Sequence, residues 1–454
     1  MDEPAAASER PAGLRTTNAG RPAWWDPSWD ALLYVAAAAG AAFTAATSLI
    51  PLYRTWGRLA LVPYAAAAAT SLVLALRGGR AGVRARAWIA AGAFLLAGLV
   101  PMAAETVARS QGHPALHVQP EVTMVEVAAG AALHGLDPYR VRYLHGPLAS
   151  QPLATKLYYP YLPAMLLFGL PRAIAGGTSP LTDARVWFML GTLLVVWAAL
   201  ALWRGPSQRR LRILQVLAVL PTGTLFLATG GDDLPVLALM LLGLVAMRER
   251  RVLLAGAALG LAVAIKQTAW PLAPFFLAAA YWRGTSGAGP RAGRRDAALA
   301  AAGMAAVALP FLAPFLAWHP AAFIRDTIRF PLNLTPNRST AATPTLGSAL
   351  IGALPHARLA LTITYAAVIL AAAALLFLSL RTAWARARPV AAAARAAGIV
   401  LAIAVVLAPA GRIGYAIYPI NLLVWAALLE PAAAATPSAP EEGGEPERAL
   451  IGAG

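Results

Sequence analysis

Long apolar runs separated by short polar stretches occupy most of this sequence. A membrane-spanning helix needs about 20 mainly apolar residues, and twelve segments approach that length, although several are shorter. They lack the alternation of apolar and polar residues that is typical of β-barrel strands. A single segment in lipid must satisfy its backbone hydrogen bonds internally, as a helix does. We therefore predict an all-α polytopic membrane protein with about 12 transmembrane helices, at 29–52, 59–76, 87–107, 186–203, 213–229, 233–247, 252–265, 270–282, 297–317, 359–380, 393–410 and 414–430.

The predicted membrane domain, residues 29–430, leaves a polar segment at each end of the chain. Residues 1–28 and the Pro-, Glu- and Gly-rich residues 431–454 are expected to be disordered tails. Residues 160–175 are apolar, but they are short and interrupted by proline, which favours an interfacial or re-entrant segment over a crossing. The pattern then predicts a long first external loop that carries interfacial helices, at about 108–185, and a second external loop at 318–358.

Composition and charge support a membrane protein. Hydrophobic residues make up 59% and charged residues 13% of the chain, against roughly 25% charged in soluble domains. The formal net charge is +17, but the arginines form small clusters between apolar runs, so membrane lipids are expected partners and nucleic acid is not. Placing these clusters inside predicts cytoplasmic N- and C-termini. The Arg- and Ala-rich composition indicates a GC-rich bacterial genome, and we expect the protein to lie in the bacterial plasma membrane.

Polar residues suited to chemistry gather in the predicted external loops. No cysteine is present, so disulfides and thiolate chemistry are excluded. His113 and His117 have the spacing of metal ligands on a helix, but Pro114 between them disfavours that helix, and we predict no metal site there. The concentration of polar groups predicts a site on the extracytoplasmic side. These groups include all six histidines, Glu121, Glu126, Asp137, Asp183, Asp232, Asp233 and Asp326.

Two stretches are similar to motifs of the GT-C glycosyltransferases, in particular the polyprenyl-phosphomannose-dependent enzymes of actinobacteria. The first is EVTMVEVAAGAALHGLDPYRV, which starts at Glu121, followed by YYPYLP. It resembles a first external loop with an acid, a helix, Gly-x-x-Pro-Tyr and a Tyr/Pro cluster. The second is ATGGDDLPVLALMLLGLVAMRERRVLLAGAALGLAVAIKQTAWPLAPF, which resembles Gly-x-x-Asp, a helix, a basic turn and an Ala/Gly-rich helix ending in lysine.

The resemblance implies a GT-C fold and an inverting sugar transfer from a polyprenyl phosphate to an acceptor hydroxyl. It also implies that an acid of the first external loop is the general base. Glu121 occupies that place, where the family more often has aspartate, and it lies in the first turn of a predicted helix, where acidic residues also serve as caps. Glu126 or Asp137 as the base, or a loss of activity, are the alternatives.

Four other charged residues are candidates for substrate binding. Lys266 ends a 14-residue apolar helix of about 21 Å, which is shorter than the hydrocarbon core of about 30 Å and leaves the lysine at membrane depth. There it needs a counter-charge, either a lipid phosphate or Asp232 or Asp233, unless it reaches the interface. Asp232 and Asp233 exceed what a helix cap requires, so they are predicted to bind sugar hydroxyls or a divalent cation. Arg412, between the last two apolar segments, suits a phosphate or lipid headgroups.

Tyrosines complete the predicted site. By resemblance to the Gly-x-x-Pro-Tyr motif and the Tyr/Pro cluster, Asp137, Tyr139, Tyr159 and Tyr161 are predicted to bind the acceptor or the donor. Tyr415 and Tyr418, by contrast, are predicted to belong to an interfacial aromatic belt.

Three whole-protein functions remain at this point. The favoured one is a hexosyltransferase, most plausibly transferring mannose to a cell-envelope glycolipid, glycan or protein. A transporter or flippase for a lipid-linked sugar would show internal repeats and broken helices, and no convincing repeat is present. A catalytically inactive relative is the third, because the family's usual aspartate is missing.

Overall fold

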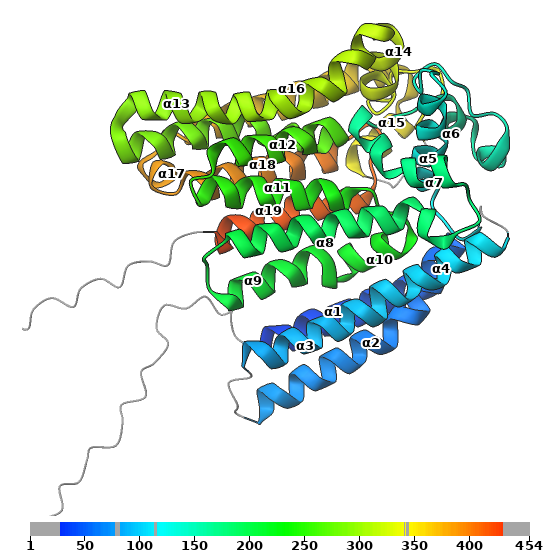
Figure 1. Cartoon of the computed structure of the whole chain (residues 1–454), viewed down its shortest axis with the longest axis horizontal. Coiled ribbons are helices and arrows are strands. Elements are labelled where there is room, and N and C mark those ends of the chain that lie inside the picture. Colours follow the sequence, from blue (N-terminus) through cyan, green and yellow to red (C-terminus); the bar gives the residue numbers. More distant parts are fainter. Residues whose placement is uncertain (1–27, 78–81, 113–115, 340, 342–344, 430–454) are drawn as a thin grey trace, which may run out of the picture. The chain divides into compact units, whose positions relative to one another are not determined.

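A computed structural model describes residues 28–77, 82–112, 116–339, 341 and 345–429, in which every regular element is a helix (Figure 1). The predicted all-α polytopic membrane protein is thereby confirmed. Both predicted tails, apart from Ser28, lie outside the described residues. The chain divides into two compact units, Met1–Val107 with Pro206–Thr229, and Ala108–Gly205 with Gly230–Gly454.

Each of the twelve predicted apolar segments overlaps a helix. By length and composition, seven helices of the described ranges can cross a membrane, or eight if a helix pair bent by 43° at Leu220 counts as one span. Two predicted segments fall in α13 (Leu272–Trp318), which folds back where Ala288 and Gly289 leave helical φ/ψ values. Three others form the shorter helices α11 (Asp233–Arg248), α12 (Val252–Ile265) and α19 (Ile417–Leu428).

The first unit is held by close helix packing and a buried ion cluster. A Cβ at Gly57 of α2 would lie 2.6 Å from Ala41 O of α1, so only glycine allows α1 and α2 to approach this closely. The Asp30 carboxylate pairs with Arg86 at 2.5 Å and with Arg212 at 2.8 Å. The elements are α1 (Ser28–Thr47), α2 (Pro51–Leu76), α3 (Val83–Phe94), η2 (Leu95–Leu99), most of α4 (Val100–Gln111), α9 (Ser207–Leu214), η7 (Gln215–Val219) and α10 (Pro221–Thr229).

In the second unit, α11 is the central helix, with α8 and α12 packed beside it (Figure 1). Every residue of α11 except Leu242 and Arg248 is buried. The small residues Gly256 and Gly260 let α12 lie directly on α13, because a Cβ at either would clash with a carbonyl of that helix. The remaining elements are α5 (Pro120–Leu133), η4 (Gly146–Leu148), α6 (Leu153–Leu157), η5 (Pro163–Phe168), α7 (Leu170–Ala175), η6 (Pro180–Thr182), α8 (Ala184–Leu202), η8 (Gln267–Ala269), α14 (Pro320–Ile324), η9 (Arg325–Arg329), α15 (Leu346–Ala353), η10 (Pro355–Ala357), α16 (Arg358–Ser379), α17 (Ala383–Ala387), α18 (Pro389–Leu407) and η11 (Ile413–Ala416).

Residues 160–175 do not form a crossing helix. They contain η5 and α7, of six residues each. The first part of this segment is buried in the second unit, where Leu162 N donates to Ile265 O at 3.2 Å. This contact brings the Tyr/Pro cluster beside the end of α12.

Candidate active site

Glu121 lies in the first turn of α5, directly after a proline at the first helical position. Its Oε1 forms an ion pair with the Arg412 guanidinium, and the Glu121 side chain is 14% exposed. Its Oε2 is buried and has no hydrogen-bond partner in the described part of the chain. Because an unpaired buried acceptor is costly, this oxygen is suited to accept a hydrogen bond from a substrate.

Lys266 joins the two aspartates at the start of α11. The Lys266 Nζ donates to Asp232 Oδ1 at 2.7 Å and to Asp233 Oδ1 at 2.6 Å. The Tyr418 hydroxyl donates to the same Asp233 oxygen at 2.7 Å. Asp232 Oδ2, in contrast, is buried without a hydrogen-bond partner among the residues that the structure describes. The cluster therefore has a second acceptor atom that is open to a ligand.

The turn before α11 brings Asp232 close to Glu121. Gly230 has φ +122°, a conformation that glycine adopts without strain, and a Cβ there would overlap the Val122 side chain in the first turn of α5. Burial raises the pKa of Asp232; Lys266 opposes this shift, and the charges of Asp233 and Glu121 add to it. Glu121, Asp232 and Asp233 thus belong to one electrostatic cluster.

Tyrosine rings surround the Lys266 ammonium. Its Nζ lies 5.7 Å from the ring centroid of Tyr161 and 5.3 Å from that of Tyr415. Burial, followed by the carboxylates of Asp232 and Glu121, raises the pKa of Tyr161 well above its usual value. The Tyr159 hydroxyl is fully buried and lacks a hydrogen-bond partner among the described side chains and backbone. Tyr159 therefore offers a third polar atom to a ligand.

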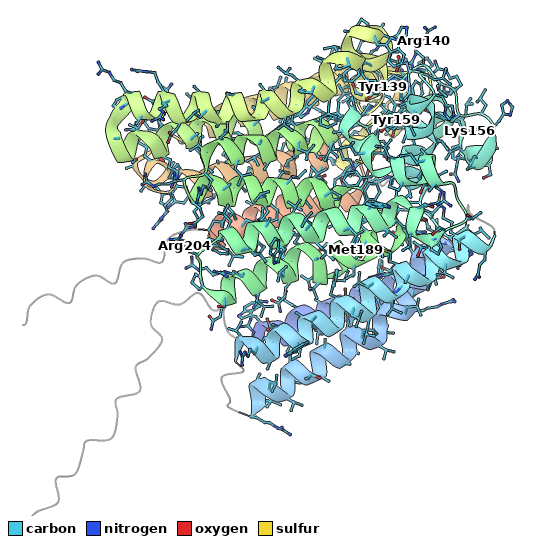
Figure 2. The ribbon with its side chains drawn as sticks, in the orientation of Figure 1. Tyr139, Arg140, Lys156, Tyr159, Met189 and Arg204 are labelled. Carbon is cyan, nitrogen blue, oxygen red and sulfur yellow. The ribbon has the colours of Figure 1, made fainter. Side chains whose placement is uncertain are left out.

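Asp137 and Tyr139 lie in an adjacent network and have partners of their own. Asp137 accepts from Tyr139 N at 3.0 Å and contacts His319 Nδ1 at 2.7 Å. The Tyr139 hydroxyl donates to Tyr161 O at 2.9 Å, and the Tyr139 and Tyr159 rings meet edge to face with centroids 5.4 Å apart. Figure 2 labels both residues in the same part of the second unit. This network positions the Tyr/Pro cluster.

Asp326 holds the backbone of Tyr159. Its Oδ2 accepts from Tyr159 N at 3.0 Å, and its Oδ1 accepts from Arg325 Nε at 2.6 Å. Burial raises the pKa of Asp326 to about 6, although both hydrogen bonds act in the opposite direction.

Glu126, the alternative base on α5, is engaged in a separate buried ion network. It accepts from Arg109 Nη2 at 2.6 Å and from Ala184 N at 3.0 Å. Arg109 also pairs with Asp183 at 2.7 Å. Burial raises the pKa of Asp183, but Arg185 and Arg109 hold it well below its usual value. The Glu126 carboxylate thereby ties α5 to the beginning of α8.

The cluster does not have the character of a cation site. Among the described residues, no three His, Asp or Glu side chains are grouped to hold a metal ion. The Lys266 ammonium lies between Asp232 and Asp233, where a divalent cation would be bound. His113 lies outside the described residues.

The structure brings together Glu121, Asp232, Asp233, Lys266, Arg412 and Tyr161 from distant parts of the sequence. It adds Tyr415, whose ring lies beside Lys266, and Tyr418. For Tyr418 the interfacial-belt prediction is wrong, because this side chain is fully buried and bonded to Asp233. The spacing of three residues between these two tyrosines, directly after Arg412, puts both on one side of a helical turn. That spacing is the signal that would have linked them to the site.

Comparison with known proteins gives one match. The model of Glycosyltransferase family 87 matches residues 159–409, more than half of the chain. This range contains Tyr159, Tyr161, Asp232, Asp233 and Lys266, whereas Glu121 precedes it and Arg412 follows it. No curated protein and no solved structure matches the chain.

Proposed function

Because the chain belongs to glycosyltransferase family 87 and is therefore a membrane glycosyltransferase, we propose that it takes its sugar from a polyprenyl phosphate. In this proposal the sugar is mannose and the acceptor is a hydroxyl of a glycolipid, glycan or protein. The reaction takes place on the extracytoplasmic side of a bacterial plasma membrane, and both termini are cytoplasmic. The family assignment makes the chain an enzyme, so the transporter interpretation is not carried forward.

The observation that carries the proposal is the Oε2 of Glu121, which has no partner among the described residues and lies beside an ion-paired Oε1. The acceptor hydroxyl donates its hydrogen bond to Oε2 and attacks the anomeric carbon. The bond from that carbon to the phosphate oxygen breaks, its electron pair leaves with the polyprenyl phosphate, and the hydroxyl proton moves to Glu121. A single displacement of this kind inverts the anomeric carbon. General-base assistance typically contributes about 10²- to 10⁴-fold to rate.

The phosphate is assigned to the two cations of the cluster. Charge develops on the leaving phosphate, so the transition state needs a nearby cation in a poorly hydrated place. Lys266 and Arg412 supply it, with Arg412 the more accessible, since its side chain is 36% exposed. Both cations pair with carboxylates, which balance their charge within the cluster.

The sugar hydroxyls are assigned to the polar atoms that lack partners. Asp232 Oδ2 and the Tyr159 hydroxyl are both buried and unpaired within the described ranges. Asp233 and Tyr161 complete this part of the site around Lys266, and Asp137 and Tyr139 hold the tyrosines in place. No step of this mechanism uses the divalent cation that the paired aspartates suggested.

The test is sugar transfer in liposomes that contain the full-length protein, labelled polyprenyl-phosphomannose and host envelope lipids. We expect wild type to form a labelled product and Glu121→Gln to lose about 10²- to 10⁴-fold of the rate. Glu121→Asp, which keeps a carboxylate, should retain measurable transfer. The configuration of the new glycosidic bond tests inversion.

Two results would contradict parts of this proposal. Unchanged transfer by Glu121→Gln would remove Glu121 as the base. A folded wild-type protein that transfers none of several polyprenyl-phosphate sugars would support the inactive-relative alternative.

A further inference from the structure

A cavity of about 490 Å³ lies in the second unit at the end of α11 and the start of α18. Both α11 and α19 run from the candidate active site to this cavity. α11 runs from Asp233 to Arg248, and α19, which contains Tyr418 in its first turn, ends at Leu428, next to the cavity residue Leu429. Sixteen helical residues in α11 correspond to about 24 Å. The cavity is therefore a separate site at the opposite ends of the same helices.

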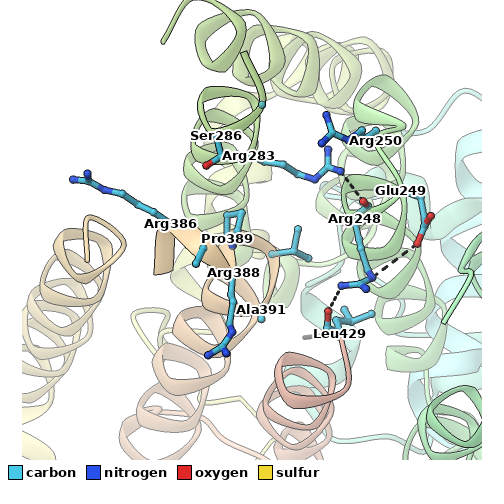
Figure 3. Close-up of a pocket in the computed structure, with 13 residues that line it drawn as sticks. Arg248, Glu249, Arg250, Arg283, Ser286, Arg386, Arg388, Pro389, Ala391 and Leu429 are labelled. Carbon is cyan, nitrogen blue, oxygen red and sulfur yellow. Dashed lines mark hydrogen bonds and ion pairs between the residues drawn. The ribbon is translucent and has the colours of Figure 1, made fainter. Parts of the chain in front are cut away.

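The walls of this cavity are strongly basic (Figure 3). Glu249 is the one acidic side chain among the 13 described residues that line it. A like-charged concave surface of this kind attracts anions, and arginine suits phosphate because its planar guanidinium donates two parallel hydrogen bonds. The five arginines are Arg248, Arg250, Arg283, Arg386 and Arg388.

Three of these arginines lie together on one side of the cavity. Figure 3 shows Arg248 and Arg250 at the α11–α12 turn and Arg283 extending toward them from α13. Backbone contacts hold two of them, because Arg283 Nη2 donates to Arg248 O at 2.7 Å and Arg248 donates to Leu429 O. The arrangement is therefore built into the fold at a fixed place.

Arg250 occupies a backbone position that normally favours glycine. It follows α11 with φ +61°, in a turn closed by a hydrogen bond from Arg251 N to Ala246 O at 2.8 Å. Such helix-ending turns usually hold glycine in this conformation. The backbone conformation alone would favour glycine over arginine at this position. Because Arg250 nevertheless lines the cavity, we infer that its guanidinium has a role there.

The opposite wall provides a second positive pole. It is formed by the first turn of α18, Pro389, Val390 and Ala391, preceded by Arg388. Pro389 has no N–H. The N–H groups of Val390 and Ala391 come before the first intrahelical hydrogen bond, from Ala392 N to Arg388 O. They can therefore bind an anion, and the helix dipole adds positive potential there. Arg386, from the same wall, stacks on Trp282 with its guanidinium carbon 4.4 Å from the ring centroid.

We propose that this cavity binds an anion with two phosphate groups, one at the three-arginine side and one at the start of α18. Its volume falls within the range of about 300–1,000 Å³ typical of small-molecule sites. The two phosphates belong either to a two-phosphate lipid headgroup or to a soluble diphosphate, since basic pockets between transmembrane helices bind such headgroups. The inference is independent of the proposed sugar transfer, because it uses none of those residues.

The experiment is thermal unfolding of the full-length protein at constant ionic strength. One arm titrates pyrophosphate in detergent; the other compares phosphatidylcholine nanodiscs containing cardiolipin with nanodiscs containing phosphatidylglycerol at equal total phosphate. We expect a saturable rise in Tm in at least one arm, and the arm that responds identifies the source of the phosphates. Arg250→Gly should weaken the apparent affinity at least about tenfold.

The variants separate binding from folding. Arg250→Gly should fold at least as well as wild type, because glycine favours this φ. Arg251→Gly is the matched control: it removes a charge from the same turn at an exposed residue that does not line the cavity, at a helix cap that tolerates glycine. It should respond like wild type, and Arg283→Gln should respond like Arg250→Gly. Three results would overturn the proposal. The first is no saturable shift in Tm in either arm. The second is an equal response to phosphatidylglycerol and cardiolipin without any response to pyrophosphate, and the third is a wild-type response from Arg250→Gly.

Discussion

Lys266 places a buried ammonium between two carboxylates, 2.7 Å from Asp232 and 2.6 Å from Asp233. A lysine at the end of a 14-residue apolar run needs a counter-charge, so the sequence indicated an aspartate or a phosphate as its partner. The sequence could not show that both aspartates pair with it at once or that Tyr418 joins them. Those contacts depend on how α19 packs against α11, which no local pattern encodes.

Removing the ammonium should destabilise the protein. Lys266→Met leaves two buried carboxylates without compensation, and we expect the free energy of unfolding to fall by about 3–5 kcal/mol. Chemical unfolding in detergent would measure the loss. Adding Asp233→Asn should recover part of it, because one uncompensated charge is then removed. Wild-type stability of Lys266→Met would mean that these carboxylates are well solvated.

Asp326 should make stability depend on pH. Its native pKa is about 6, whereas an unfolded aspartate releases its proton near pH 4. The native state therefore binds more protons in this window, and stability falls as pH rises through it, by about 3 kcal/mol. Unfolding midpoints measured across the window should decline less in Asp326→Asn, which stays neutral. Equal slopes for the two proteins would contradict the raised pKa.

At the scale of elements, α5 presents two glutamates to different surroundings. Glu121 pairs with Arg412 and keeps one oxygen unpaired within the described chain, whereas Glu126 is enclosed by Arg109 and the start of α8. Their separation of five residues, about 140° around a helix, already predicted that they face apart. The identity of the Glu126 partners could not be predicted, because Arg109, Arg172 and Ala184 come from three different elements, α4, α7 and α8.

The two glutamates should give opposite phenotypes. Glu121→Gln should lose transfer while the free energy of unfolding changes by less than about 1 kcal/mol, because its ion pair is partly exposed. Glu126→Gln should lose about 3 kcal/mol of stability, because it breaks a buried pair, while its folded fraction stays active. Transfer rates and unfolding curves on the same preparations provide the comparison. If the two variants lose transfer rate and stability to the same extent, the two glutamates do not have the separate roles assigned here.

At the scale of the molecule, hydrophobic length predicted which segments are helical but not all of their connections. The twelve apolar runs overlap helices, since lipid-exposed backbone allows little else. The fold-back within α13 at Ala288 and Gly289 and the burial of residues 161–166 arise from packing between distant segments. The division of the chain into two compact units also follows from such long-range contacts.

The proposed orientation can be tested directly because the chain has no cysteine. Ser150 and Ser207 are both exposed and fall in a predicted external loop and a predicted internal loop. In intact cells, a membrane-impermeant maleimide should label Ser150→Cys and leave Ser207→Cys unlabelled until permeabilisation. The cysteine-free wild type is the background control. The reverse pattern would place the candidate active site in the cytoplasm.

The enclosure of α11 has a consequence for membranes of different thickness. Helices that touch lipid respond to a thicker or thinner bilayer by tilting or by deforming it. All but two residues of α11 are buried in protein, so lipid cannot set its tilt directly. Its sixteen residues act as a spacer of fixed length between the aspartates at one end and the arginines at the other. The separation of these two charged layers should therefore stay constant while the outer helices adapt to the surrounding lipid.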